Sequence, residues 1–154
     1  MLRERIEEYL ADHTTLNLAT YGPGGLWACA VLYVNVGTTL YFTSVAQTRH
    51  GVNINTSGIV SGTINDDCKS WETMAGVQLG GIVEKVTDFD ERRRVVRAYL
   101  EKFPYSTALW HGESEADMIA LDPQGHDFYR LTPNQLLFTD NQTAPGRREE
   151  LALA

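Results

Sequence analysis

Residues 26–50 read LWACAVLYVNVGTTLYFTSVAQTRH, and this stretch decides the fold class. It holds two runs rich in β-branched and aromatic residues, 26–36 and 39–44, separated by Gly37 and Thr38. Two such runs with a short glycine-containing connection are typical of a β-hairpin. The polar residues that follow predict a short helix within residues 45–57. The stretch therefore predicts two antiparallel strands that lead into a helix.

Further strands are predicted on both sides of this stretch. Residues 16–21 (LNLATY) precede it, and a GPGG breaker separates them from it. After it, extended runs at 59–65 and 71–86 predict two more strands, and the adjacent Gly80 and Gly81 predict a bend at a barrel corner. Short strands are also expected around residues 118–121, 126–131 and 136–139.

Two amphipathic helices are expected to pack against the strands. One opens the chain with four apolar residues on one face, Leu2, Ile6, Tyr9 and Leu10. The other begins at a capping box formed by Asp88 and Glu91 and ends before Pro104. Its apolar face holds Val96, Tyr99, Leu100 and Phe103. Because strict alternation of strands and helices is missing, the pattern favours a mainly β chain, a closed or split barrel with attached helices, over a Rossmann sheet.

Length and charge narrow the range of partners. The chain fits a single domain, residues 1–154, with a polar tail from about residue 141 that we expect to be flexible. Its formal net charge of −7 argues against nucleic acid, because phosphate contacts need clustered Lys and Arg. The longest apolar stretches fall well below the roughly 20 residues of a membrane-spanning helix, and the charged N-terminus lacks a secretory signal. We therefore expect no membrane contact and a cytoplasmic location.

The cysteines and histidines do not predict a redox pair or a metal site. Cys29 and Cys68 lack C-x-x-C spacing, so we expect two free thiols. The four histidines stand singly along the chain, at positions 13, 50, 111 and 126. Metal sites usually show closer spacing of their ligands in sequence, so no metal cofactor is expected.

Six segments in fixed order carry a resemblance to a known family. They read LNLAT, GGLWACAVLY, LYFTSVAQTRHGVNI, GIVSGTI, GVQLGGIVEKV and RAYLEKFP, and they lie between about residues 7 and 139. In this order they resemble the pyridoxamine-5'-phosphate-oxidase-like split barrels that bind flavin mononucleotide (FMN). A branch of short, uncharacterised bacterial proteins in that family shares the GVQ-x-x-G segment and a terminal FTDN, here residues 138–141. The resemblance implies a split β-barrel of the Greek-key type with peripheral helices, bound FMN, and a homodimer with the cofactor at the subunit interface.

The segment LYFTSVAQTRH places a helix start directly after a strand. The first N–H groups of a helix are unpaired and its dipole is positive there, so such a start favours an anion. Arg49, whose guanidinium matches phosphate oxygens, and a hydroxyl from Thr43 or Thr48 would complete a phosphate cradle. In the family this segment holds the FMN phosphate, commonly through an Arg-Lys pair; here His50 takes the second position and would make binding depend on pH. Without the resemblance, Thr48 is simply a helix cap and Arg49 a solvated charge.

The resemblance also assigns residues to the flavin ring. Residues 30–32 lie where the family lays backbone groups along the polar edge of the flavin, and Gln78 stands where a family glutamine reaches the ring. From the residues alone, 30–32 are part of a core strand and Gln78 faces outward. Tyr33, Trp71 and Trp110 are weaker candidates for sheltering the ring, since aromatic residues in a barrel usually belong to its core. The implied cofactor-binding residues are Ala30, Val31, Leu32, Phe42, Thr43, Thr48, Arg49, His50 and Gln78.

No catalytic side chain can be named from the sequence. It has no Ser-His-Asp order, no P-loop and no dinucleotide fingerprint, and in flavin enzymes the cofactor supplies the electron chemistry. Arg130 is the only near counterpart of the oxidase's residues for substrate phosphate, which argues against pyridoxamine phosphate as the substrate. Three functions stay open: an FMN-dependent oxidoreductase acting on an unknown small molecule, a binding or storage protein for flavin, haem or deazaflavin, and a ligand-free interaction barrel.

Overall fold

The computed structural model describes residues 1–106 and 126–153, which form three helices and seven strands. The helices are α1 (Leu2–Asp12), α2 (Arg49–Thr56) and α3 (Phe89–Lys102). The strands are β1 (Thr15–Gly22), β2 (Gly25–Val36), β3 (Thr39–Val45), β4 (Ile59–Asn65), β5 (Ala75–Lys85), β6 (His126–Asp140) and β7 (Arg148–Glu150). None of the helices in these ranges is long and apolar enough to cross a membrane.

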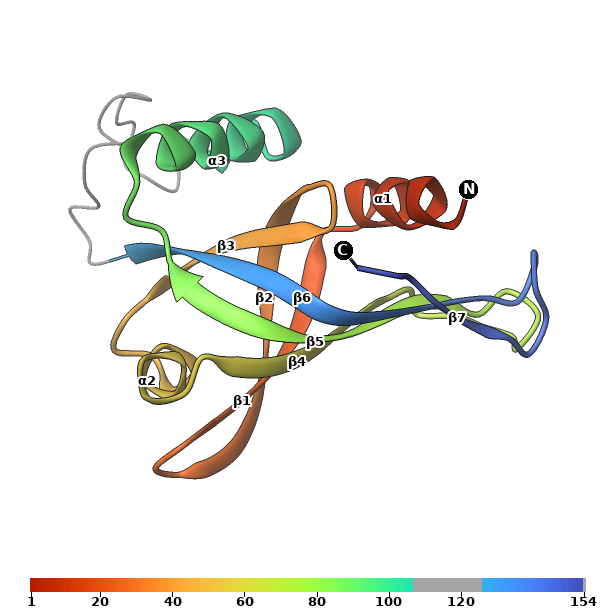
Figure 1. Ribbon diagram of the computed structural model, residues 1–154, viewed down its shortest axis with the longest axis horizontal. Coiled ribbons are helices and arrows are strands. Elements are labelled where there is room, and N and C mark those ends of the chain that lie inside the picture. Colours follow the sequence, from red (N-terminus) through yellow and green to blue (C-terminus); the bar gives the residue numbers. More distant parts are fainter. Residues whose placement is uncertain (107–125, 154) are drawn as a thin grey trace.

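Six strands close into an antiparallel barrel (Figure 1). Their order is β3-β2-β1-β4-β5-β6, and β6 pairs again with β3 to close the ring. The first half of β6 pairs with β3 and its last residues pair with β7. In the view of Figure 1, α1 and α3 lie above the barrel and α2 lies below it. The prediction of a mainly β barrel with peripheral helices is confirmed.

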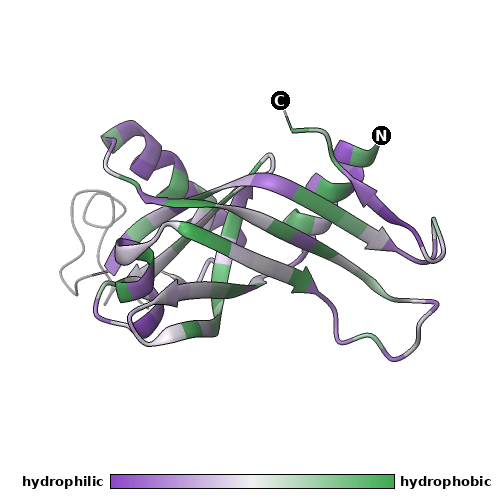
Figure 2. Cartoon of the chain, turned by 60° about the horizontal axis from the view of Figure 1, so that its bottom comes forward, coloured by the Kyte–Doolittle hydropathy of each residue, from purple (hydrophilic) through white to green (hydrophobic). Residues whose placement is uncertain are grey.

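Alternation of buried and exposed residues along the strands builds the core. In β1 the buried side chains are Leu16, Leu18 and Thr20, since successive residues of a strand face opposite sides. Leu16 and Leu18 belong to the same cluster inside the barrel as Ile6 and Leu10 of α1. A second cluster joins α3 to β2, β3 and β6. Figure 2 shows hydrophobic and hydrophilic segments alternating along both the strands and the helices.

The predicted capping box of α3 is only half formed. The Asp88 carboxylate accepts a hydrogen bond from the Glu91 N–H at 2.8 Å, as expected of an N-cap. The Glu91 carboxylate instead accepts from Arg130 Nη1 with both oxygens, at 2.6 and 2.8 Å, and from the Tyr41 hydroxyl at 3.1 Å. Hydrogen bonding to Glu91 raises the pKa of Arg130 above its usual value. Arg130 therefore holds α3 on the barrel.

Three stretches differ from the expectation from sequence. Residues 126–140 form one continuous strand instead of two short ones, because β5 pairs with β6 along nearly the whole length of β6. The strand predicted from residue 71 begins at Ala75. Instead of a flexible tail, the residues after 140 turn back to form β7, and Leu151 and Leu153 pack against the barrel core. The strand predicted near residues 118–121 lies outside the described residues.

The bend predicted at Gly80 and Gly81 is a β-bulge. The register of β5 against β6 shifts between these two residues, close to Pro133, which has no N–H to pair. A Cβ at position 81 would lie 2.5 Å from the Thr132 carbonyl oxygen, whereas a Cβ at position 80 would meet only Asn134 Oδ1 at 3.6 Å. Of these two positions, only 81 needs a glycine to avoid a clash with the neighbouring strand.

We expect Gly81→Ala to destabilise the fold by about 1–3 kcal/mol, because its methyl group would force two paired backbones apart. Gly80→Ala is the matched control and should change the free energy of unfolding by less than about 1 kcal/mol. Urea unfolding of both variants measures the difference. Equal losses in the two variants would show that the bulge relaxes around a side chain.

Candidate functional site

A cavity of about 360 Å³ opens where β2 and β3 separate. The two strands share a ladder only between Tyr33–Val36 and Thr39–Phe42. Beyond it, residues 43–45 of β3 pair with β6, whereas residues 30–32 of β2 keep only β1 as a neighbour. The cavity occupies this split. In the described part of the chain it is lined by Ala30, Val31, Leu32, Thr43, Ser44, Val45, Thr48, His50, Tyr99, Phe103, Tyr105, Ser106 and His126.

Tyr99 of α3 spans the split between the two strands. Its hydroxyl lies 3.0 Å from the Leu32 carbonyl oxygen and 3.3 Å from the Tyr41 carbonyl oxygen and donates toward both. Burial raises the pKa of this phenol, so it keeps its proton. Because the Leu32 carbonyl points into the split, the backbone groups of Ala30, two residues earlier, point the same way. No described strand lies beside Ala30 on that side, so its N–H and C=O can bind a ligand.

The N-terminus of α2 borders the polar end of the cavity. Thr48 is its N-cap: Oγ1 accepts from the Gly51 N–H at 3.1 Å and donates to the Val45 carbonyl at 2.7 Å. The predicted helix start and cap are therefore present. The N–H groups of Arg49 and His50 precede the intrahelical ladder, which makes this end of the cavity suited to an anion.

His50 hydrogen-bonds within the same polar end. Its Nε2 contacts Ser44 Oγ and lies 3.3 Å from Thr48 Oγ1. Burial lowers the pKa of His50 below the ordinary imidazole value, so the ring is mainly neutral at pH 7. This end of the cavity therefore presents hydroxyl groups and a neutral imidazole. The His50 ring would become charged here only if a bound phosphate stabilised its protonated form.

Two hydroxyl groups in the cavity lining have no partner. Thr43 Oγ1 and Ser106 Oγ are both buried, and neither forms a hydrogen bond with a described residue. Buried polar atoms in proteins are nearly always hydrogen-bonded, so this pair is suited to polar atoms of a ligand. The buried hydroxyl of Tyr129 is also unpartnered, but it belongs to the barrel core and does not line the cavity.

The structure gathers six of the nine predicted site residues at this cavity: Ala30, Val31, Leu32, Thr43, Thr48 and His50. Arg49 does not line it. Its Nη2 donates to the Gly24 carbonyl at 2.8 Å, and its guanidinium lies 4.2 Å above the Trp27 ring. These contacts hold the tip of the β1–β2 hairpin against α2. The role of Arg49 at a phosphate stays a prediction.

Phe42 and Gln78 also lie away from the cavity. Phe42 is fully buried inside the barrel and stacks on Tyr129 with centroids 5.3 Å apart. The reason is the two-residue period of a strand, which turns Thr43 toward the cavity and Phe42 away from it. Gln78 is exposed on the outer face of β5, opposite Thr63. A single chain therefore cannot bring Gln78 to this cavity.

Two of the three aromatic candidates, Tyr33 and Trp71, do not join the cavity either. Tyr33 is fully buried in the barrel core, and Trp71 is exposed in the turn before β5. Trp110 lies outside the described residues. Among the described residues the aromatic lining is formed by Tyr99, Phe103 and Tyr105, of which the first two were predicted on the apolar face of a helix.

Sequence reasoning missed three polar residues of the lining, Ser44, Ser106 and His126. Ser44 could have been found from its place in the strand-to-helix segment. Ser106 and His126 come from the end of α3 and the start of β6, and no sequence signal brings these ends together. Among the described residues no group of three His, Cys, Asp or Glu side chains is arranged to hold a metal ion.

Comparison with known proteins identifies the family. The family described as pyridoxamine 5'-phosphate oxidase matches residues 2–139. The chain belongs to the pyridoxamine 5'-phosphate oxidase family. Among relatives of this family member, a UPF0306 protein of Enterobacter sp. strain 638 is 26% identical over 145 residues, covering 93% of this chain and 91% of that protein.

Solved structures share the fold of this pyridoxamine 5'-phosphate oxidase family member at low identity. A conserved hypothetical protein from Mycobacterium tuberculosis matches with a TM-score of 0.74 and 17% identity, over 100% of this chain and 94% of that one. HutZ, the haem storage protein from Vibrio cholerae, matches with a TM-score of 0.69 and 20% identity, over 88% and 92% of the two chains. These likenesses confirm the split barrel, whose split here lies between β2 and β3.

We expect His50 to make the fold less stable in acid. Because burial lowers its pKa in the folded state, the unfolded chain takes up this proton at higher pH than the folded chain does. The free energy of unfolding should therefore fall as the pH drops below about 6.5, the ordinary imidazole value. Asn cannot titrate. In denaturant titrations the free energy of unfolding of His50→Asn, relative to wild type, should therefore rise as the pH is lowered from about 7 to about 5. A constant difference across that range would contradict the burial of the ring.

Proposed function

We propose that this protein binds FMN in the cavity between β2 and β3 and works as a homodimeric, flavin-dependent oxidoreductase on a small molecule. One observation carries the proposal: the unpaired backbone edge of Ala30 and the N-terminus of α2 border the same cavity. A flavin has a polar ring edge that both donates and accepts hydrogen bonds, and FMN ends in a phosphate. The backbone edge suits the ring, and the helix start suits the phosphate.

The rest of the lining fits this ligand. A volume of about 360 Å³ lies within the usual range of ligand pockets. Val45, Tyr99 and Phe103 offer an apolar and aromatic wall to a flat ring. The hydroxyls of Thr43 and Ser106 offer two hydrogen bonds that no described residue satisfies.

FMN, when bound, would supply the electron transfer, and the chain would position the ring and limit its access to water. No described side chain needs an acid or base role for this. Arg130 is held by both oxygens of Glu91, so a substrate phosphate could reach it only by breaking that ion pair. The proposed substrate is therefore a small molecule other than pyridoxamine phosphate.

The outer face of β2, β1, β4 and β5 supports the proposed homodimer. Two cross-strand rows run over it, Ala28-Ala19-Ser61-Gly80 and Ala30-Asn17-Thr63-Gln78. Neither row contains a charged residue, although 21% of the chain is charged. At the margins of this face Leu26 and Ile59 are 80% and 73% exposed. A broad uncharged face with exposed apolar side chains is typical of a subunit interface.

Gln78 would gain a role in such a dimer. Ala30, at the border of the cavity, and Gln78 are the two ends of one cross-strand row. A two-fold axis that lies in the interface, parallel to the strands and between β1 and β4, would place Gln78 of the partner subunit over Ala30. This arrangement would bring its amide to the ligand, which a single chain cannot do.

The cofactor content of the purified protein tests the proposal. We expect a yellow protein that releases about one FMN per chain on denaturation, with a dimer mass in light scattering. Reduction of the bound flavin by NADPH or NADH with repeated turnover would distinguish an oxidoreductase from a storage protein. A haem or deazaflavin spectrum, or no chromophore after incubation with FMN, would overturn the FMN assignment. A monomer with bound FMN would overturn the dimer.

Removal of the unpartnered Thr43 hydroxyl should have opposite effects on stability and binding. In ligand-free protein, Thr43→Val should leave the free energy of unfolding unchanged or raise it by up to about 1 kcal/mol, because no hydrogen bond is lost. FMN affinity should fall by about three- to tenfold. Tyr129→Phe is the matched control, because it removes an unpartnered buried hydroxyl outside the cavity and should leave affinity unchanged. Equal FMN affinity of Thr43→Val and wild type would show that Thr43 does not contact the ligand.

A further inference from the structure

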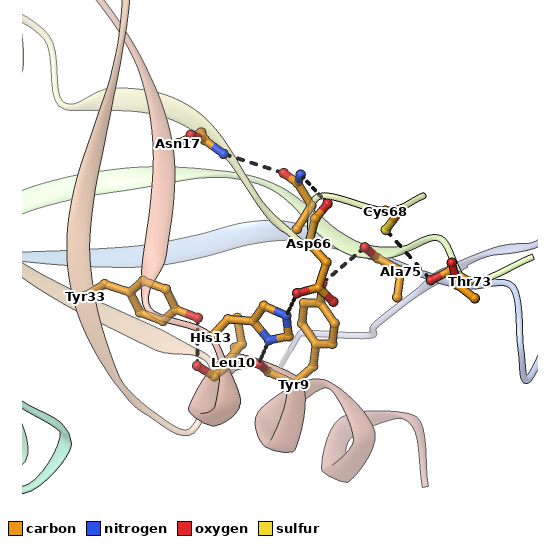
Figure 3. Close-up of polar contacts among 10 residues, drawn as sticks. Tyr9, Leu10, His13, Asn17, Tyr33, Asp66, Cys68, Thr73 and Ala75 are labelled. Carbon is orange, nitrogen blue, oxygen red and sulfur yellow. Dashed lines mark hydrogen bonds and ion pairs between the residues drawn. The ribbon is translucent and has the colours of Figure 1, made fainter. Parts of the chain in front are cut away.

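His13 joins the end of α1 to the connection between β4 and β5, residues 66–74 (Figure 3). Its Nδ1 lies 2.7 Å from the Tyr9 carbonyl oxygen, and its Nε2 lies 2.8 Å from Asp66 Oδ1. The imidazole stacks on the Tyr9 ring with centroids 3.8 Å apart. The Tyr9 hydroxyl in turn donates to the Ala75 carbonyl at 3.1 Å. The last turn of α1 is thereby fixed to both ends of the connection.

Both ring nitrogens of His13 face groups that only accept hydrogen bonds. The Tyr9 carbonyl has no proton to give, and the Asp66 carboxylate accepts as well. An imidazole donates from both nitrogens only as the imidazolium ion. The position also favours a cation, because His13 is the C-cap of α1, where the helix dipole is negative.

Acidic groups surround this cluster, and the cation Arg5 of α1 pairs with one of them, Asp140, at 3.3 Å. Asp12 precedes His13 on α1, Asp66 and Cys68 belong to the connection, and Asp140 ends β6. After burial, which is the larger cause, the negative charges of Asp66, Cys68 and Asp140 raise the pKa of Tyr9.

The connection between β4 and β5 lines part of a second cavity, of about 430 Å³. Asp66, Asp67 and Cys68 line it together with Gln78 of β5. The second half of the connection is tied to Asn141, whose amide donates to the Trp71 carbonyl at 2.7 Å. The first half is tied to α1 through His13. The His13–Asp66 contact therefore adds a side-chain tie between this wall and α1, beside the pairing of Asn65 with Gly76 and the contact of Cys68 Sγ with the Thr73 carbonyl oxygen.

We propose that His13 is a positioning residue whose imidazolium form clamps residues 66–68 to α1 and so sets the wall of the cavity that contains Gln78. When the ring loses its second proton, one of the two donors disappears and the wall is released. The clamp is a property of the single chain. Its effect on a ligand beside Gln78 of the partner subunit rests on the proposed function.

The charge of the ring is tested directly by long-range nitrogen–proton NMR on ligand-free protein at about pH 7. We expect two protonated nitrogens on His13. His50 is the internal reference and should show one protonated nitrogen, because burial lowers its pKa. A single protonated nitrogen on His13 under these conditions would overturn the proposal.

The clamp is tested through the labelling rate of Cys68 by iodoacetamide, read by mass spectrometry with Cys29 as the reference thiol. His13→Gln and the surface variant Asp66→Asn each remove the ion pair, and the second serves if the first does not fold. Labelling should be about three- to tenfold faster than in wild type near pH 7 in both variants. A ratio of one in both variants would overturn the clamp, and because no ligand is present neither outcome depends on FMN binding.

Discussion

The hydroxyl of Tyr99 donates toward the carbonyls of Leu32 and Tyr41, at the point where β2 and β3 part. Beyond this point β3 keeps its ladder with β6, which begins at Leu40, and β2 has one edge without a described partner strand. If the β2–β3 ladder continued, the backbone groups of Ala30 would be used within the sheet and no cavity would exist. The split therefore depends on the docking of α3, and α3 depends in turn on the ion pair between Glu91 and Arg130.

Several cationic side chains of this protein join structural elements. Arg5 links α1 to Asp140 and Glu149, and Arg49 links α2 to the β1–β2 hairpin. The cavity is left with backbone groups, hydroxyl groups, a helix start and a neutral imidazole. Such neutral groups bind a phosphate through directed hydrogen bonds rather than net charge, so binding should depend little on ionic strength. They also suit more than one flat anionic ligand, and the split barrel itself occurs in a protein named for haem storage.

The uncharged outer face of the sheet connects the cavity at the β2–β3 split with the cavity beside residues 66–68. Ala30 borders the first cavity, Gln78 lines the second, and Asn17 and Thr63 lie between them in one row. A two-fold dimer across this face would place the first cavity of each subunit against the second cavity of the other. The clamp at His13 and the helix start at Thr48 would then act on one ligand site from different subunits, although each belongs to a separate part of a single chain.

The sequence by itself determined the barrel class, the helix start at Thr48, the bulge at Gly80 and Gly81, and the two amphipathic helices. These features depend on local periodicity, turn residues and caps, which act over a few neighbouring positions. The continuous β6 and the strand β7 were not predictable, because hydrogen bonds to distant strands override weak local propensity.

The partners of long polar side chains were decided only by the tertiary structure. The contacts of Arg49 with Gly24 and Trp27 could not be found from local sequence, because they form only where the β1–β2 hairpin packs against α2. From the sequence alone His13 had no assigned role. In the folded protein it contacts Asp66, which lies 53 positions further along the chain. A flexible charged side chain takes whichever acceptor folding brings within reach, and that choice depends on contacts between residues far apart in sequence.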